Sequence, residues 1–109
     1  MLVDSLGTWL AARISRHLDA APDAPLDPAA LEAEIDEVAS ALLESAAHAI
    51  VVGEEVGWGL VPPFPSGRIF RDVLGRAQQR LARGATHSYL VVAGFALDLR
   101  AHGIAVDAT

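Results

Sequence analysis

The sequence predicts an α/β domain in which a mostly parallel sheet is flanked by helices. Short apolar runs at residues 1–4, 50–52 and 88–93 have the length and composition of buried strands. Longer segments with helical apolar periodicity separate these runs. Because helices between successive strands produce right-handed crossovers, the strands are expected to pair in parallel within one sheet.

The first half of the chain supplies one strand and two helices. After the strand at residues 1–4, a turn at 5–7 leads into a helix at 8–18, whose apolar stripe is Trp9, Leu10, Ile14 and Leu18. Residues 19–28 hold three prolines and three aspartates, which predicts a loop. A capping acid followed by proline, Asp27-Pro28, then starts a helix expected to end near residue 46. Its apolar face is formed by Leu31, Ile35, Val38 and Leu42, and its acids, Glu32, Glu34, Asp36 and Glu37, are interpreted as a solvated face.

The second half supplies the remaining strands and one long helix. After the strand at 50–52, residues 54–65 contain glycines and prolines that predict an irregular loop. Ser66 is expected to cap a helix that Gly84 ends. A strand at 88–93 is stopped by Gly94, and residues 95–99 form a short fourth strand. The tail begins at about residue 101, so residues 1–109 are one domain with no internal linker.

Composition narrows the class of protein. The chain is 52% hydrophobic, which predicts a folded core, and it has no apolar run of the roughly 18 residues that would cross a membrane. A formal net charge of −6 argues against a nucleic-acid partner. Zero cysteines exclude disulfides and suit a cytoplasmic location. No lysine is present, so the 109 residues cannot form a Gly-x-x-x-x-Gly-Lys-Ser/Thr phosphate loop.

Charge is unevenly distributed along the chain. Between residues 19 and 55 there are ten acids and no Lys or Arg, whereas residues 68–83 hold five arginines and one aspartate. In the arginine-rich helix, Arg68 and Arg71 lie nearest the glycine-rich loop and are candidate phosphate contacts. The alternative is that these arginines are merely solvated. The four histidines show no metal-ligand spacing and are expected at the surface, and Trp9 and Trp58 are expected to pack.

The loop that follows residues 50–52 is the strongest candidate site. It contains Glu54, Glu55, Gly57 and Gly59, directly after a strand end, where ligands bind in open parallel sheets. Asp4 also follows an apolar strand, so neighbouring strands would bring Asp4 and Glu55 to the same edge. Two carboxylates at such an edge suit Mg²⁺ bound to a nucleotide. The alternative for the loop is an ordinary strand-to-helix turn with solvated acids. The alternative for Asp4 and Glu55 is that they are two unrelated strand-end acids.

Four motifs in order resemble the later part of the adenosylcobinamide kinase/adenosylcobinamide-phosphate guanylyltransferase family. Residues 1–10 are similar to its apolar strand, carboxylate and Trp-Leu helix, and residues 55–62, Glu-Val-Gly-Trp-Gly-Leu-Val-Pro, to its Glu-Val-Gly-x-Gly-Ile-Val-Pro signature. Residues 70–82 are similar to its Phe-Arg-Asp…Gly-Arg-x-Asn-Gln-x-Leu-Ala helix, and residues 90–94 to its last core strand. The departures are Ser5 for a common Cys, Glu54 for Asn, Gln78 for Asn and Thr86 for Asp.

This resemblance implies a RecA-like P-loop NTPase fold, here truncated because the family's first strand, phosphate loop and guanylylated histidine have no counterpart. The implied enzyme phosphorylates adenosylcobinamide, then transfers GMP from GTP to adenosylcobinamide phosphate, using Mg²⁺ with GTP or ATP, as a homo-oligomer. The resemblance implies that Asp4 binds nucleotide, whereas this chain alone holds no catalytic histidine or lysine and is expected to be inactive. Two alternatives stay open: a non-catalytic half-domain that acts as an interaction or oligomerisation module, and an unrelated small α/β binding protein.

Overall fold

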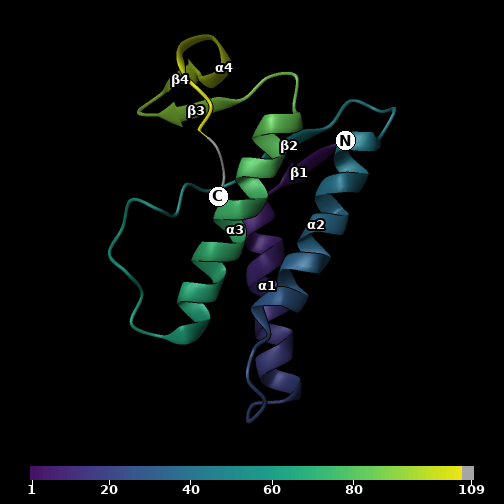
Figure 1. The fold of residues 1–109 in the computed structure, drawn as a ribbon, viewed down its shortest axis with the longest axis vertical. Helices are drawn as coiled ribbons and strands as arrows, with labels where there is room; N and C mark the ends of the chain where they lie inside the picture. The colour runs from purple at the N-terminus through teal and green to yellow at the C-terminus, as the bar shows by residue number, and fades with distance from the viewer. Residues whose placement is uncertain (107–109) are drawn as a thin grey trace.

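Three helices lying side by side form the body of the computed structural model, which describes residues 1–106 (Figure 1). The helices are α1 (Leu6–Ala20), α2 (Pro28–Glu44) and α3 (Pro65–Gly84). Two short strands, β1 (Leu2–Asp4) and β2 (Ile50–Val52), lie at one end of the helices. The chain continues into β3 (Tyr89–Val92), β4 (Phe95–Asp98) and a single-turn helix, α4 (Leu99–His102).

Local capping chemistry sets where the helices begin. Asp27 accepts a hydrogen bond from the Ala29 N–H and Pro28 occupies the first turn of α2, as predicted. Helix α1 begins two residues earlier than expected, because the Ser5 side chain caps it by accepting from the Thr8 N–H. The prediction that Ser66 caps α3 was wrong: the cap position is Phe64, and a proline in the first turn starts the helix.

The core lies among the three helices and follows the predicted stripes. Its fully buried centre combines Leu10 of α1, Ile35 of α2, and Val73 and Leu74 of α3, each 0% exposed. Half-buried apolar side chains surround this centre, including Trp9 and Leu81. Burying such side chains contributes about 1.5–3 kcal/mol each, so this cluster is the main source of stability of the helical unit.

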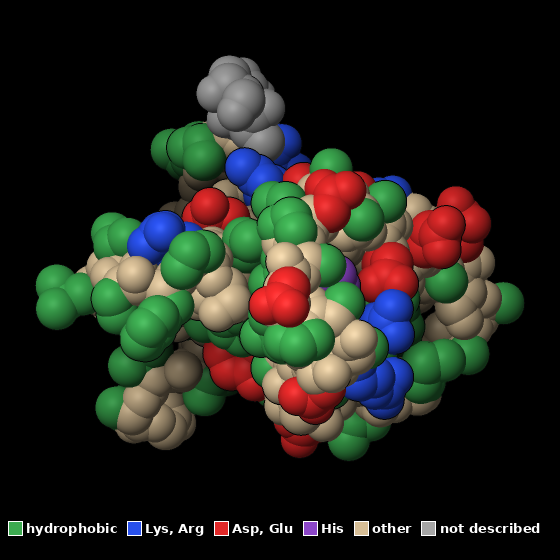
Figure 2. Space-filling model, turned by 90° about the horizontal axis from the view of Figure 1, so that it is seen from below, with side chains coloured by type: hydrophobic (Ala, Val, Ile, Leu, Met, Phe, Trp, Pro, Cys, Tyr) green, Lys and Arg blue, Asp and Glu red, His purple; other side chains and the backbone are tan. Residues whose placement is uncertain are grey.

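Ion pairs connect α2 to both neighbouring helices, so the interpretation of its acids as a solvated face was wrong for three of them. Glu34 pairs with Arg13 of α1 at 2.5 Å. Toward α3, the Glu32–Arg76 and Asp36–Arg80 pairs measure 3.2 and 3.0 Å. Figure 2 shows carboxylates beside arginines on the face seen from below. The acidic and arginine-rich segments of the sequence therefore face one another.

The single mostly parallel sheet predicted from the sequence is instead two separate two-stranded sheets. Strands β1 and β2 pair in parallel, as expected, but β3 pairs antiparallel with β4. A two-residue turn closes this hairpin, with φ of 51° at Ala93 and 81° at Gly94, the positive values that tight hairpin turns require. The fourth strand ends at Asp98, whose side chain caps α4. The expected tail therefore begins with one helical turn, and residues 107–109 lie outside the described residues.

The β3–β4 hairpin stands apart from the core and is apolar on both faces. Its register puts Leu90 with Leu97 on one face and Val91 with Ala96 on the other. None of its residues belongs to the core cluster, and Phe95 is 80% exposed. The accessible surface of the chain is 7777 Å², whereas about 5,800 Å² is typical of a compact protein of this mass. Within the described residues, no helix has the length and hydropathy needed to span a bilayer.

Candidate functional site

The carboxyl ends of β1 and β2 meet at one edge, as the sequence predicts. Their parallel register places Asp4 opposite Val52. Helix α1 leaves this edge on one side, and an irregular loop at residues 53–64 leaves it on the other (Figure 1). The strand-end carboxylates and the glycine-rich loop are therefore brought to the same side of the small sheet.

Asp4 and Glu55 are the two carboxylates expected to hold a cation. Both residues are exposed, Asp4 at the end of β1 and Glu55 in the loop that follows β2. Glu55 Oε1 accepts a hydrogen bond from the Gly57 N–H at 3.0 Å, which leaves its second oxygen available. Exposed carboxylate oxygens are ligands that Mg²⁺ accepts, together with phosphate oxygens and water, so the residues fit such an ion. In residues 1–106 no group of three or more acidic or histidine side chains forms a metal cluster.

Glu54 turns back over the first turn of α1, a contact that the sequence analysis missed. Its Oε1 accepts a hydrogen bond from the Ser5 hydroxyl, which also lies 2.8 Å from the Thr8 hydroxyl. Its carboxylate occupies the space that a side chain at Gly7 would need. A carboxylate at a helix N-terminus is favoured by the helix dipole. Glu54 therefore joins the end of β2 to the start of α1.

The two candidate phosphate contacts bind the loop itself. Arg71 Nη2 donates to the Gly57 carbonyl at 3.2 Å. Arg68 Nη1 donates to the carbonyls of Pro62 and Pro63 at 3.1 and 3.2 Å. A phosphate role for these arginines stays a prediction.

The tip of the loop presents apolar side chains to solvent. Trp58 is 72% exposed, so the expectation that it packs was wrong. Leu60, between Gly59 and Val61, is 96% exposed. The glycines on both sides of Trp58 and the prolines that follow keep the loop out of any helix or strand, so its tip lies in solvent, although Val56 near its start packs against the core cluster.

Comparison with known proteins identifies the chain. A family model described as cobinamide kinase / cobinamide phosphate guanyltransferase matches residues 1–99. The chain belongs to this family. The loop at residues 53–64, which holds the motif that resembles the family's signature and is called the signature loop below, lies within the matched residues.

Two curated relatives of this family member carry the name bifunctional adenosylcobalamin biosynthesis protein CobU. The Escherichia coli (strain K12) protein is 38% identical over 71 residues, which are 65% of this chain and 39% of the relative. The Salmonella typhimurium (strain LT2) protein is 38% identical over 78 residues, 68% of this chain and 43% of the relative. The chain therefore matches less than half the length of either relative.

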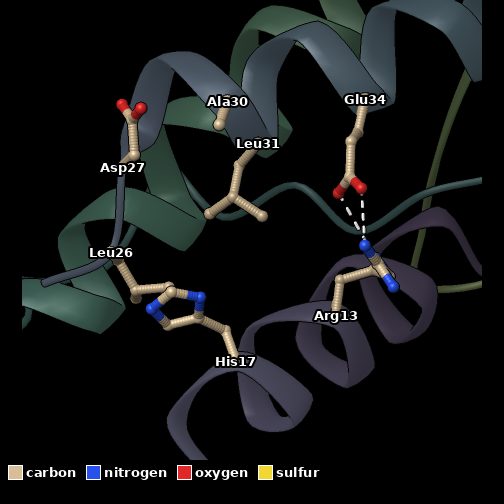
Figure 3. Close-up of a pocket in the computed structure, with 7 residues that line it drawn as sticks. All are labelled: Arg13, His17, Leu26, Asp27, Ala30, Leu31 and Glu34. Atoms are coloured by element: carbon tan, nitrogen blue, oxygen red, sulfur yellow. Dashed lines mark hydrogen bonds and ion pairs between the residues drawn. The ribbon is translucent and has the colours of Figure 1, made fainter. Parts of the chain in front are cut away.

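A small pocket lined by residues of α1, of α2 and of the loop between them is drawn in Figure 3. It has a volume of about 180 Å³ and lies between α1 and the start of α2, beside the Arg13–Glu34 ion pair. His17, expected at the surface, is half-buried here, and its Nε2 is buried without a hydrogen-bond partner among the described residues. Arg13 lies in the middle of α1 and His17 in its last turn, so the pocket is not at the end of α1 that follows β1.

Proposed function

We propose that this chain is the C-terminal part of a cobalamin-biosynthesis transferase. The complete enzyme would phosphorylate adenosylcobinamide and then transfer GMP from GTP to adenosylcobinamide phosphate. The observation that carries this proposal is the family match over residues 1–99, and the names of the two bifunctional relatives agree with it. The site geometry supports it as well, since the signature loop and Asp4 share the carboxyl edge where nucleotides bind in α/β sheets.

Within this proposal the edge residues have distinct roles. Asp4 and Glu55 are the carboxylates that would hold Mg²⁺, and Asp4 would bind the nucleotide. Mg²⁺ would neutralise charge on the phosphates of ATP or GTP, and exposed carboxylates can hold it without leaving their strands. Gly57 and Gly59 give the loop backbone close access to a ligand. A cytoplasmic location and a homo-oligomeric state are part of the same proposal.

The isolated chain is proposed to be inactive. Its 109 residues hold no lysine, and none of its histidines, His17, His48, His87 and His102, lies in a context that matches the family's guanylylated histidine. Phosphoryl transfer needs cationic groups that neutralise the charge of the phosphates, and GMP transfer needs a side chain that takes up GMP. The carboxylates at the edge can do neither. The remaining groups would come from polypeptide corresponding to the unmatched part of the relatives.

Transfer of radiolabel to adenosylcobinamide tests this proposal. The purified chain is compared with a fusion in which the unmatched N-terminal part of the Escherichia coli relative precedes residue 1. We expect no labelled product from the chain alone with γ-labelled ATP or α-labelled GTP, and product from the fusion. Labelling by the chain alone would contradict the inactivity, and a folded fusion that transfers neither group would contradict the function.

A second candidate function, an interaction module, is favoured by the β3–β4 hairpin. Strands that are apolar on both faces are typical of sheets covered on both sides, yet Val91 is 69% and Phe95 80% exposed. The excess of roughly 2,000 Å² over the expected surface is comparable to the area of a stable interface. If the chain functions by pairing alone, it should form a defined complex without transferase activity, which light scattering after gel filtration would detect.

A further inference from the structure

The signature loop has a defined path although it contains no regular structure. Residues 53–64 connect β2 to α3 with no helix or strand among them. Side chains of α3 donate hydrogen bonds to backbone carbonyls near the start, the middle and the end of this loop. The donors are Gln78 to Glu54 at 2.8 Å, Arg71 to Gly57 at 3.2 Å, and Arg68 to Pro62 and Pro63 at 3.1 and 3.2 Å.

These three donors share one face of α3. They are separated by three and seven residues, spacings that return to the same side of a helix after about one and two turns. The fourth position on this face is Gly75, and a side chain there would meet no atom within 4 Å. The face therefore has room beside the loop, and its long polar side chains cross that room to reach the carbonyls.

The backbone at Gly57 is fixed through both of its polar groups. Its N–H donates to Glu55 Oε1 at 3.0 Å, and its carbonyl accepts from Arg71 at 3.2 Å. These two contacts orient the peptide that leads into Trp58, which is otherwise exposed. Arg71 is thus placed to set the position of the loop tip.

We propose that Arg68, Arg71 and Gln78 are positioning residues that clamp the signature loop, so that Arg71 acts on a ligand only through the loop. This inference deepens the proposed function, because it replaces a direct phosphate contact with control of loop shape. A guanidinium already bonded to a carbonyl holds its partner in a fixed geometry. The clamp lets α3 hold the tip of the loop in solvent, while Val56 near the start of the loop packs against the core cluster.

Hydrogen–deuterium exchange of the isolated chain tests the clamp without any measurement of activity. In Arg71→Gln, the Gly57 amide, which donates to Glu55, should exchange about five- to tenfold faster, since the bond that fixes the Gly57 carbonyl is lost, while amides of α1 and α2 keep their rates. Fluorescence of Trp58, recorded in a Trp9→Phe background, should change in parallel. Arg71→Lys can still donate one hydrogen bond and should restore most of the protection. Arg83→Gln is the matched control, because it removes the same charge from α3 away from the loop.

Three results would overturn the clamp. The first is unchanged loop exchange in both Arg71→Gln and Arg68→Gln, and the second is equal loosening in Arg83→Gln. The third uses inorganic tripolyphosphate as a probe: binding that Arg71→Gln abolishes while loop exchange stays unchanged would make Arg71 a direct phosphate ligand. Failure of the fusion enzyme to transfer phosphate or GMP would leave all these exchange rates unaffected, so the two proposals fail separately.

Discussion

Replacing Ser5 by alanine should remove three contacts from the junction between β1 and α1, one of which is the 2.8 Å contact with the Thr8 hydroxyl. The Ser5 hydroxyl accepts from the Thr8 N–H at 3.1 Å as the cap of α1, and it donates to the Glu54 carboxylate. Loss of a serine cap costs about 1 kcal/mol. The bond to Glu54 adds about 1 kcal/mol, a value reduced from the usual charged hydrogen bond because Glu54 is exposed.

The free energy of unfolding of the helical unit should therefore fall by about 2 kcal/mol in Ser5→Ala. This change corresponds to a fall of about 10 °C in the midpoint of thermal unfolding. Urea titration followed by circular dichroism at 222 nm measures this change. Ser45→Ala is the matched control, because its hydroxyl makes only one exposed contact, with the Ala47 N–H, and its loss should cost under about 0.5 kcal/mol. The reasoning is refuted if the two variants lose the same stability, or if Ser5→Ala remains equally costly in a Glu54→Ala background.

Three further outcomes are expected. In the fusion enzyme, Asp4→Asn should lower kcat/KM for the Mg²⁺–nucleotide by about 30-fold. Glu55→Gln should lower kcat and leave the midpoint of urea unfolding unchanged. If both variants were as active as the wild-type fusion, the proposed site would be contradicted. His17→Leu should raise the free energy of unfolding by about 1 kcal/mol, because it removes a buried unpartnered nitrogen, and a loss of stability would contradict that account. The chain alone should associate on gel filtration, and Phe95→Lys should reduce the association; a monodisperse wild-type monomer would argue against an exposed apolar hairpin.

The features that the sequence predicted well depend on neighbours in the chain. Asp27-Pro28 starts α2 because capping involves only the first turn. The apolar stripes gave the core positions Leu10, Ile35 and Val73 because helical periodicity decides which face is buried. The parallel pairing of β1 with β2 followed from the helices between them.

The features that it missed join residues far apart in the chain. Arg80 and Asp36 form an ion pair but are 44 residues apart, and the periodicity of each helix predicted only that both side chains face solvent. The opposite charges of the acidic and arginine-rich segments were a signal that could have predicted the pair. The contact of Ser5 with Glu54 likewise depends on how β2 lies beside β1. The antiparallel pairing of β3 with β4 was missed as well. A tight turn at Ala93 and Gly94 makes the next strand in the chain the partner of β3. Apolar periodicity does not show whether a strand pairs with such a neighbour or with a distant parallel strand. The meeting of the carboxyl ends of β1 and β2 was predictable, whereas the shared site of Asp4 and Glu55 and their chemical roles stay predictions.

The isolation of the β3–β4 hairpin has a consequence for the cooperativity of unfolding. Its links to the helical unit are hydrogen bonds to the last turn of α3, from Ser88 and Arg100 to the Ala82 carbonyl and from Arg100 to the Arg83 carbonyl. With no shared apolar core, the hairpin can melt while the three helices stay folded. Calorimetric and van't Hoff enthalpies would then disagree, and no single midpoint would describe the whole chain. Stabilities obtained from the helical signal would belong to the three-helix unit alone.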